Sequence, residues 1–317
     1  MDNRAKLKTI NYFFRVHSKS IRHCHEPREE CKQPAIRAHS IPSSTVLAQL
    51  AQKGHVVMLK MKIKTQPSAK IDFKYVGKNK ATTFTGLCAQ HDKDIFSPID
   101  NSLPDLTNDS HLFLLAYRAV LREYHVVLQN AIRFQSIYQK RVEVGLSPGT
   151  RPCKYGMFAT SHVRNAIECY EYKRHFDHAY LAGDWSQLKH NIFILQNQSP
   201  SIAVSSLFSL DEVDAPKTPR VALSVFPIDT NVAVIFSSIP CDAVYVNTYL
   251  HRILTSESYH QKYLLSKLIL QSCDNFVMSP KYFELMPQDQ KDAICQFFID
   301  TILRNAEDHE DKRLYLF

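Results

Sequence analysis

The chain has 317 residues, of which 44% are hydrophobic and 11% aromatic, which excludes a disordered protein and suffices for two hydrophobic cores. No stretch of eighteen apolar residues occurs, and residues 1–20 lack the apolar run of a signal peptide, so we expect a cytoplasmic protein without a membrane partner. The eight cysteines are unevenly spaced, which is typical of reduced thiols rather than of a disulfide framework.

Positive charge is concentrated at the N-terminal end of the chain. Residues 1–80 contain 17 Lys and Arg against 5 Asp and Glu, a net charge of +12, whereas the whole chain carries +8. A concentrated positive surface favours polyanions, and the phosphate backbone of DNA or RNA is the commonest one in cytoplasm. The charge therefore predicts a nucleic-acid partner, and the alternative is a hairpin of ordinary solvated lysines.

Short elements fill the N-terminal hundred residues. The pattern at 43–55 predicts a helix, because a pair of serines precedes the apolar positions and Gly54 follows them. Apolar and basic residues then alternate over 56–65 and over 70–77, which predicts two strands of a hairpin. One face of this hairpin would present five lysines as a phosphate-binding surface: Lys60, Lys62, Lys64, Lys70 and Lys74.

Longer elements follow. Apolar periodicity predicts a long helix within 105–145 and a second within 162–185 that ends near Gly183, and a short connection should make the two antiparallel. Four β-branched runs predict an antiparallel sheet: 191–196, 201–209, 220–229 and 231–239. Residues 250–305 read as helical throughout. We therefore expect an α+β protein with a small basic domain, 1–105, and a larger domain of helices and sheet, 106–317, that senses or binds a partner.

Two pairs of metal ligands occur in the basic segment. Cys24 and Cys31 form one pair, and Cys88 and His91 form the other in a Cys-x-x-His spacing at the start of a short helix. Structural zinc prefers four thiolate and imidazole ligands presented in this way, so the four residues predict one structural Zn²⁺. The six residues between Cys24 and Cys31 are more than the usual two to four, and His23, His25 or His39 remain alternatives to either thiol.

The segment AHSIP at 38–42, with cysteines before it and the Cys-x-x-His helix after it, resembles the zinc-stabilised HNH, or ββα-metal, nucleases. The resemblance covers residues 20–100 and implies a treble-clef-like fold. It also implies that His39 is a general base and that Asp92 helps to hold a catalytic Mg²⁺ or Mn²⁺. Ala38 stands where the family has a metal-binding acid, which weakens the implied activity more than the implied fold.

Two functions follow from this reading. The first is a metal-dependent nuclease acting on DNA or RNA, in an arrangement that resembles proteins of bacterial anti-phage defence. The second is a zinc-stabilised nucleic-acid-binding or adaptor protein without turnover. In either case residues 190–317 are a candidate docking region for a partner subunit.

Overall fold

The computed structural model describes residues 3–17, 20–28, 30–62, 70–196, 198–211, 214–304 and 310–317. The chain forms two compact units built from interleaved segments. Unit 1 combines Met1–Ala38, Phe84–Lys93 and Val120–Asp184, and unit 2 combines His39–Thr83, Asp94–Ala119 and Trp185–Phe317. Each unit is defined by which segments pack together and not by their order along the chain. The predicted domain boundary near residue 105 stays a prediction.

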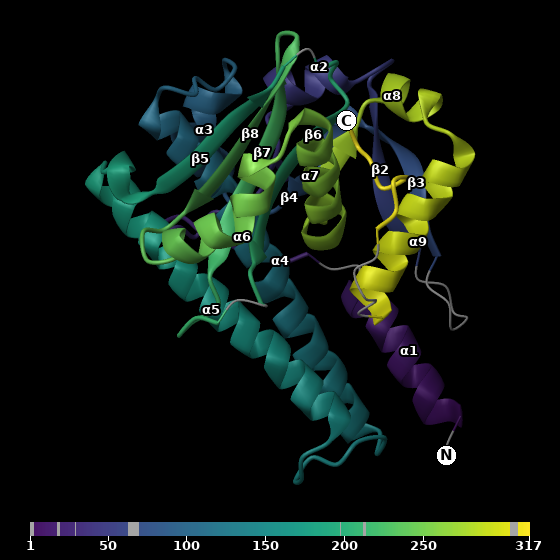
Figure 1. Cartoon of the computed structure of the whole chain (residues 1–317). Coiled ribbons are helices and arrows are strands. Elements are labelled where there is room, and N and C mark those ends of the chain that lie inside the picture. Colours follow the sequence, from purple (N-terminus) through teal and green to yellow (C-terminus); the bar gives the residue numbers. More distant parts are fainter. Residues whose placement is uncertain are drawn as a thin grey trace. The chain divides into compact units, whose positions relative to one another are not determined.

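Unit 1 is largely helical and contains the first helix, α1 (Asn3–His17), and most of the two long helices α4 (Asp109–Glu143) and α5 (Lys154–Ala182) (Figure 1). Aromatic contacts show that α4 and α5 run antiparallel, since Phe134 of α4 stacks on His162 at 4.3 Å whereas the earlier Tyr124 meets the later Tyr170 at 5.6 Å. The predicted pair of long antiparallel helices is therefore confirmed.

The second long helix begins earlier than the sequence predicts. Pro152 precedes its start, and the sulfur of Cys153 accepts a hydrogen bond from the backbone amide of Gly156, which caps the first turn. Its end at Gly183 is as predicted, because that residue adopts φ 64° and provides the left-handed conformation that closes a helix.

Unit 2 contains a seven-stranded sheet in which the neighbouring strands are antiparallel, in the order β3-β2-β9-β6-β7-β8-β5. The strands are β2 (His55–Lys62), β3 (Lys70–Gly77), β5 (Lys189–Leu195), β6 (Ile202–Ser209), β7 (Arg220–Ile228), β8 (Asn231–Ser238) and β9 (Phe276–Met278). The α+β class, the hairpin and the four-stranded antiparallel sheet are thus confirmed. The hairpin and the four strands form one sheet, because β9 lies between β2 and β6.

Strand β9 contradicts the expectation that residues 250–305 are helical throughout. The segment forms α6 (Ala243–Thr255), α7 (Ser258–Ser272), α8 (Pro280–Leu285) and α9 (Gln288–Arg304), with β9 inserted after α7. Only three residues pair, too few to show a period of two, and they sit fully buried between two longer strands. Residues 276–278 therefore form a strand because they are buried between β2 and β6, although the local sequence pattern favours a helix.

The core of unit 2 lies between one face of the sheet and the C-terminal helices. Val204, Leu223 and Val234 project from adjacent strands into a cluster that also includes Leu250 of α6 and Ile269 of α7. These side chains are 2% exposed or less, so the sheet and helices share one continuous apolar layer. Among the residues that the structure describes, no helix is both long enough and apolar enough to cross a bilayer.

Shorter elements connect these parts. The predicted helix at 43–55 is a π-helical turn, Ser43–Leu47, continued by α2 (Ala48–Leu50). It ends early because Lys53 and Gly54 have φ of 47° and 75° and reverse the chain into β2. Two-residue strands, β1 (Ala38–His39) and β4 (Thr83–Phe84), pair with each other, and β4 is followed by α3 (Ala89–Asp100). Short 3₁₀ turns occupy Lys78–Lys80 and Trp185–Gln187.

Candidate metal centre

The two predicted ligand pairs meet in unit 1. The loop that carries Cys24 and Cys31 is held against residues 86 and 87, where the amide of His25 donates to the carbonyl of Gly86 at 2.8 Å. The amide of Ile36 donates in the same way to the carbonyl of Leu87, also at 2.8 Å. Backbone hydrogen bonds on both sides of the loop therefore fix both thiols beside the start of α3.

A buried carboxylate explains how six intervening residues still form a tight loop. Glu26 is 2% exposed, and its carboxylate accepts hydrogen bonds from the amide of Glu30 at 3.1 Å and from Nε of Arg28 at 3.2 Å. Burial by itself would raise the pKa of Glu26, but the hydrogen bonds from Arg28 and Glu30 lower it, so the carboxylate stays ionised. The ionised carboxylate of Glu26 therefore stabilises the loop between Cys24 and Cys31 by accepting hydrogen bonds from residues of the loop itself.

The second pair is positioned by the first turn of α3. Cys88 immediately precedes the helix, and the amides of His91 and Gln90 are directed at its sulfur. Burial raises the pKa of the Cys88 thiol, but these hydrogen bonds and those of Cys31 and Cys24 lower it overall. A cysteine before the first turn and a histidine within it therefore present both donors to the same side.

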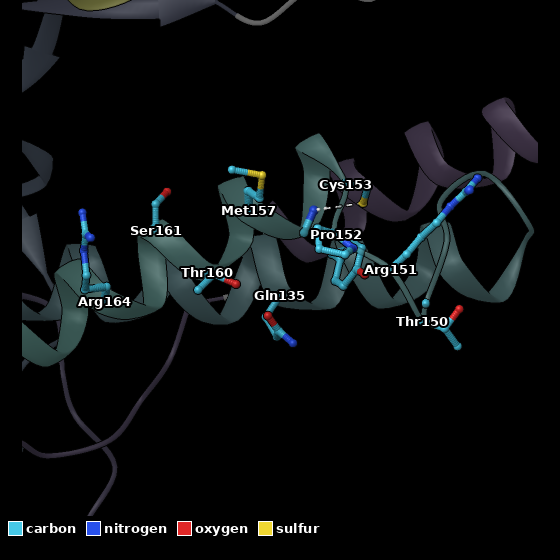
Figure 2. Close-up of a pocket in the computed structure, with 12 residues that line it drawn as sticks. Gln135, Thr150, Arg151, Pro152, Cys153, Met157, Thr160, Ser161 and Arg164 are labelled. Atoms are coloured by element: carbon cyan, nitrogen blue, oxygen red, sulfur yellow. Dashed lines mark hydrogen bonds between the residues drawn. The ribbon is translucent and has the colours of Figure 1, made fainter.

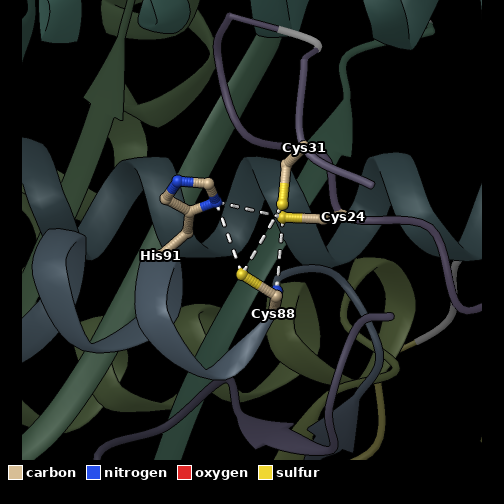
Figure 3. Close-up of side chains that lie close together, drawn as sticks. All are labelled: Cys24, Cys31, Cys88 and His91. Atoms are coloured by element: carbon tan, nitrogen blue, oxygen red, sulfur yellow. Dashed lines mark hydrogen bonds between the residues drawn. The ribbon is translucent and has the colours of Figure 1, made fainter. Parts of the chain in front are cut away.

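Four donor atoms converge on one point (Figure 3). Sγ of Cys31 lies 3.8 Å from Sγ of Cys88, and Nδ1 of His91 lies 3.4 Å from Sγ of Cys88 and 3.5 Å from Sγ of Cys24. All four donor atoms lie within 4.8 Å of one another. Zinc bonds of about 2.3 Å to sulfur and about 2.0 Å to nitrogen give tetrahedral edges of about 3.8 and about 3.5 Å. The three separations given above match these edges.

The chemistry of the donors also fits a cation. The cysteines are free thiols, and Cys24 is 1% exposed. Burial raises the pKa of the Cys24 thiol to about 12, although the amides of Cys88 and Glu26 donate to its sulfur and oppose that rise. A divalent cation among the sulfurs would favour the thiolate forms and reverse this effect.

The alternative ligands have other neighbours. The ring of His25 meets Tyr124 edge-on at 4.9 Å and lies 5.8 Å from the ring of His125. His23 contacts His25 at 5.5 Å. Neither belongs to the cluster of donor atoms, which consists of the three cysteines and His91 among the described residues. The structure thus brings together the four residues that spacing favoured.

His39 belongs to unit 2, and its Nε2 lies 3.1 Å from the carbonyl of Lys78. A carbonyl only accepts, so Nε2 carries the proton and Nδ1 is the basic nitrogen. Burial lowers the pKa of His39, and the nearby Arg118 adds to this effect. Asp92, the second predicted catalytic residue, lies in unit 1 in the first turn of α3.

The carboxylate beside His39 already has a cationic partner. Asp100 accepts two hydrogen bonds from the guanidinium of Arg118, both at 2.7 Å. Arg118 is 2% exposed, and its guanidinium also lies over the ring of Phe96 at 4.1 Å. The sequence does not indicate the ion pair of Arg118 and Asp100, because an arginine within a long amphipathic helix is usually solvent-exposed.

The hairpin places its even-numbered residues on one face. Strand register sets Lys62 opposite Lys70 and Lys60 opposite Asp72, while Lys74 lies opposite Met58. The described strands therefore carry four of the predicted lysines on the same face, with one acid among them. The fifth, Lys64, lies outside the described residues. Phosphate binding by this face stays a prediction.

Comparison of the chain with protein-family models, with curated proteins and with solved structures gave no match in any of the three.

Proposed function

We propose that the chain is a zinc-binding protein in which Cys24, Cys31, Cys88 and His91 hold one structural zinc ion. The observation that carries the proposal is the convergence of four donor atoms within 4.8 Å of one another, three of whose separations, 3.4 to 3.8 Å, agree with the edges of a zinc tetrahedron. Protein side chains fill all four positions, so the ion stabilises the fold rather than binding a substrate. It would join the loop at 24–31 to the start of α3.

The order of elements supports a treble-clef-like arrangement around this ion. A ligand-bearing loop precedes β1, β1 pairs with β4, and α3 follows with the second ligand pair. The segment between β1 and β4, which includes β2 and β3, is then an insertion in the small hairpin of such a module. This order favours the resemblance to the zinc-stabilised HNH proteins at the level of fold.

The function we propose for this protein is nucleic-acid binding. Its support is the excess of basic residues in 1–80 and the four lysines that register places on one face of β2 and β3. Asp72 opposite Lys60 reduces the charge of that face, so we expect moderate affinity without strong sequence preference. The direct experiment is a titration of DNA and RNA at several salt concentrations.

A second candidate function, metal-dependent cleavage of nucleic acid, is favoured by one observation. His39 donates through Nε2 to a carbonyl and keeps an unprotonated Nδ1, and its lowered pKa keeps the ring neutral, as a general base requires. Against it, Asp100 is already bound by Arg118, and Ala38 replaces the acid of the resembling family. Mg²⁺ or Mn²⁺ would need Asp92 as its ligand.

One comparison separates the two functions. Purified protein and its His39→Ala variant are incubated with plasmid, single-stranded DNA and RNA in Mg²⁺ or Mn²⁺, and binding and cleavage are measured together. Binding without cleavage by both proteins supports the binding function. Cleavage that His39→Ala abolishes, at unchanged zinc content, supports the nuclease. Failure of the wild type to bind any nucleic acid would refute both.

A further inference from the structure

The three cysteines of the proposed zinc site differ in their access to solvent. Cys24 and Cys88 are 1% and 3% exposed, whereas Cys31 is partly exposed on its loop. A bound zinc ion keeps each of these sulfurs in the thiolate form, which is the form that oxidants attack. A small oxidant from solvent therefore reaches the site first at Cys31.

A second sulfur is close enough to react with an oxidised Cys31. Sγ of Cys88 lies 3.8 Å from Sγ of Cys31, and the two side chains extend towards each other from the start of α3 and from the loop (Figure 3). Because sulfurs in a disulfide lie about 2.05 Å apart, this pair must approach by about 1.8 Å. Two thiols at this separation can form a bond after a small local movement.

Backbone amides hold the two buried sulfurs in place. The sulfur of Cys24 accepts a hydrogen bond from the amide of Cys88 at 3.3 Å. The amides of His91 and Gln90 are in turn directed at the sulfur of Cys88. Burial and these hydrogen bonds restrict both sulfurs, so the partly exposed Cys31 supplies the movement, with Cys88 as the partner at 3.8 Å.

Unit 1 contains another partly exposed thiol, Cys153, which provides an internal comparison. Its sulfur accepts a hydrogen bond from the amide of Gly156 at 3.4 Å, beside a cavity of about 630 Å³ (Figure 2). The described residues that line this cavity include no second cysteine. Cys153 thus shares the accessibility of Cys31 but has no thiol beside it in the cavity, so its oxidation does not lead to a disulfide there.

We propose, on the basis of the zinc site proposed above, that this site is a redox switch in which hydrogen peroxide joins Cys31 to Cys88 and releases the zinc ion. Peroxide transfers one oxygen to the Cys31 thiolate, which becomes a sulfenic acid, and hydroxide leaves. The Cys88 thiolate attacks that sulfur, the S–S bond forms and a second hydroxide leaves. The two thiolates lose two electrons, and with two protons the peroxide becomes two molecules of water.

Oxidation leaves the zinc ion with too few ligands. Cys24 and His91 are the remaining donors, and structural zinc needs four protein ligands. The disulfide still joins the loop at Cys31 to the start of α3, so the chain stays close to its zinc-bound arrangement. A thiol reductant that cleaves the S–S bond regenerates both thiolates, and the site binds zinc again.

The test measures zinc and disulfide in the same sample of full-length protein. Protein purified with its zinc is treated with hydrogen peroxide, zinc release is followed with a chromogenic chelator, and the disulfide is located by mass mapping of unreduced peptides. We expect zinc release together with a Cys31–Cys88 disulfide, and recovery of the zinc content after reduction in the presence of Zn²⁺. Cys153→Ser is the control and should release zinc at the wild-type rate.

Substitutions that keep four zinc ligands separate the exposed sulfur from a buried one. Cys31→His removes the sulfur that peroxide reaches first, so zinc release should be at least about 10-fold slower. Cys24→His is the matched variant, because it keeps the reacting pair and should release zinc as the wild type does. Should either variant fail to hold zinc, the disulfide map of the wild type decides.

Two different failures are distinguishable in this experiment. A wild-type protein without zinc before treatment would refute the zinc site itself and the switch with it. A zinc ion that stays bound in peroxide, or that leaves without a Cys31–Cys88 disulfide, would overturn the switch and leave the zinc site standing. Equal release rates from zinc-loaded Cys31→His and wild type would also overturn the switch.

Discussion

Replacement of Cys88 by serine should release the zinc ion and disorder the loop that it fixes. The sulfur of Cys88 lies 3.8 Å from that of Cys31 and 3.4 Å from Nδ1 of His91, and the Cys88 amide donates to Cys24. One substitution thus disturbs every neighbour in the cluster. We expect zinc affinity to fall by at least about 10³-fold, which corresponds to about 4 kcal/mol of the stability of unit 1.

Hydrogen exchange of single backbone amides measures this loss of stability at the loop itself. The amides of His25 and Ile36 donate to the carbonyls of Gly86 and Leu87, so their protection reports whether the loop is closed. Both should exchange about 10³-fold faster in Cys88→Ser, while amides of the sheet in unit 2 keep their protection. Cys241→Ser is the control, because Cys241 is exposed and lies outside the cluster. A Cys88→Ser protein that retains zinc and protection would exclude Cys88 as a ligand that holds the loop closed.

Three further predictions concern other parts of the chain. Replacing Lys60 and Lys74 by alanine should reduce the slope of log affinity against log salt by about 1.8, measured by fluorescence anisotropy, and an unchanged slope would exclude this face as the phosphate contact. Lys173 and Asp177 form an ion pair at 2.6 Å with side chains 2% and 6% exposed. Lys173→Met should therefore cost about 3–5 kcal/mol in urea denaturation, and adding Asp177→Leu should recover most of it. Burial lowers the pKa of His125 to about 4, so its contribution to stability is complete above pH 6.5 and falls by up to about 3 kcal/mol towards pH 4. His125→Gln should lose less stability over that range.

The clustering of the four candidate ligands was predictable in part, because local spacing indicates one of the two pairs. A Cys-x-x-His sequence at a helix start brings both donors to one side whatever the rest of the fold does, and Cys88 and His91 behave in this way. The closure of the loop at Cys31 was not predictable in the same way. It depends on Glu26, whose buried carboxylate accepts a hydrogen bond from the amide of Glu30 within the loop. A glutamate in a polar stretch is usually exposed to solvent, so the sequence does not indicate this role.

The long helices and the strands of seven or more residues were predictable from their patterns, whereas the three-residue strand β9 was not, for a related reason. The periods of α4 and α5 repeat many times, whereas β9 has three residues and owes its conformation to β2 and β6 on either side. Residues 1–20 fit a strand or a helix equally by pattern, and 3–17 form a helix. The union of the hairpin with the central sheet depends on contacts more than 200 residues apart along the chain, which no local pattern encodes.

X-ray absorption at the zinc edge of protein purified without chelators tests the proposed zinc site most directly. We expect one zinc per chain, with three sulfur neighbours at about 2.3 Å and one nitrogen neighbour at about 2.0 Å. His91→Cys should convert this signal to four sulfur neighbours. A protein that contains no zinc, or a bound zinc surrounded mainly by oxygen, would contradict a zinc site made of three cysteines and His91.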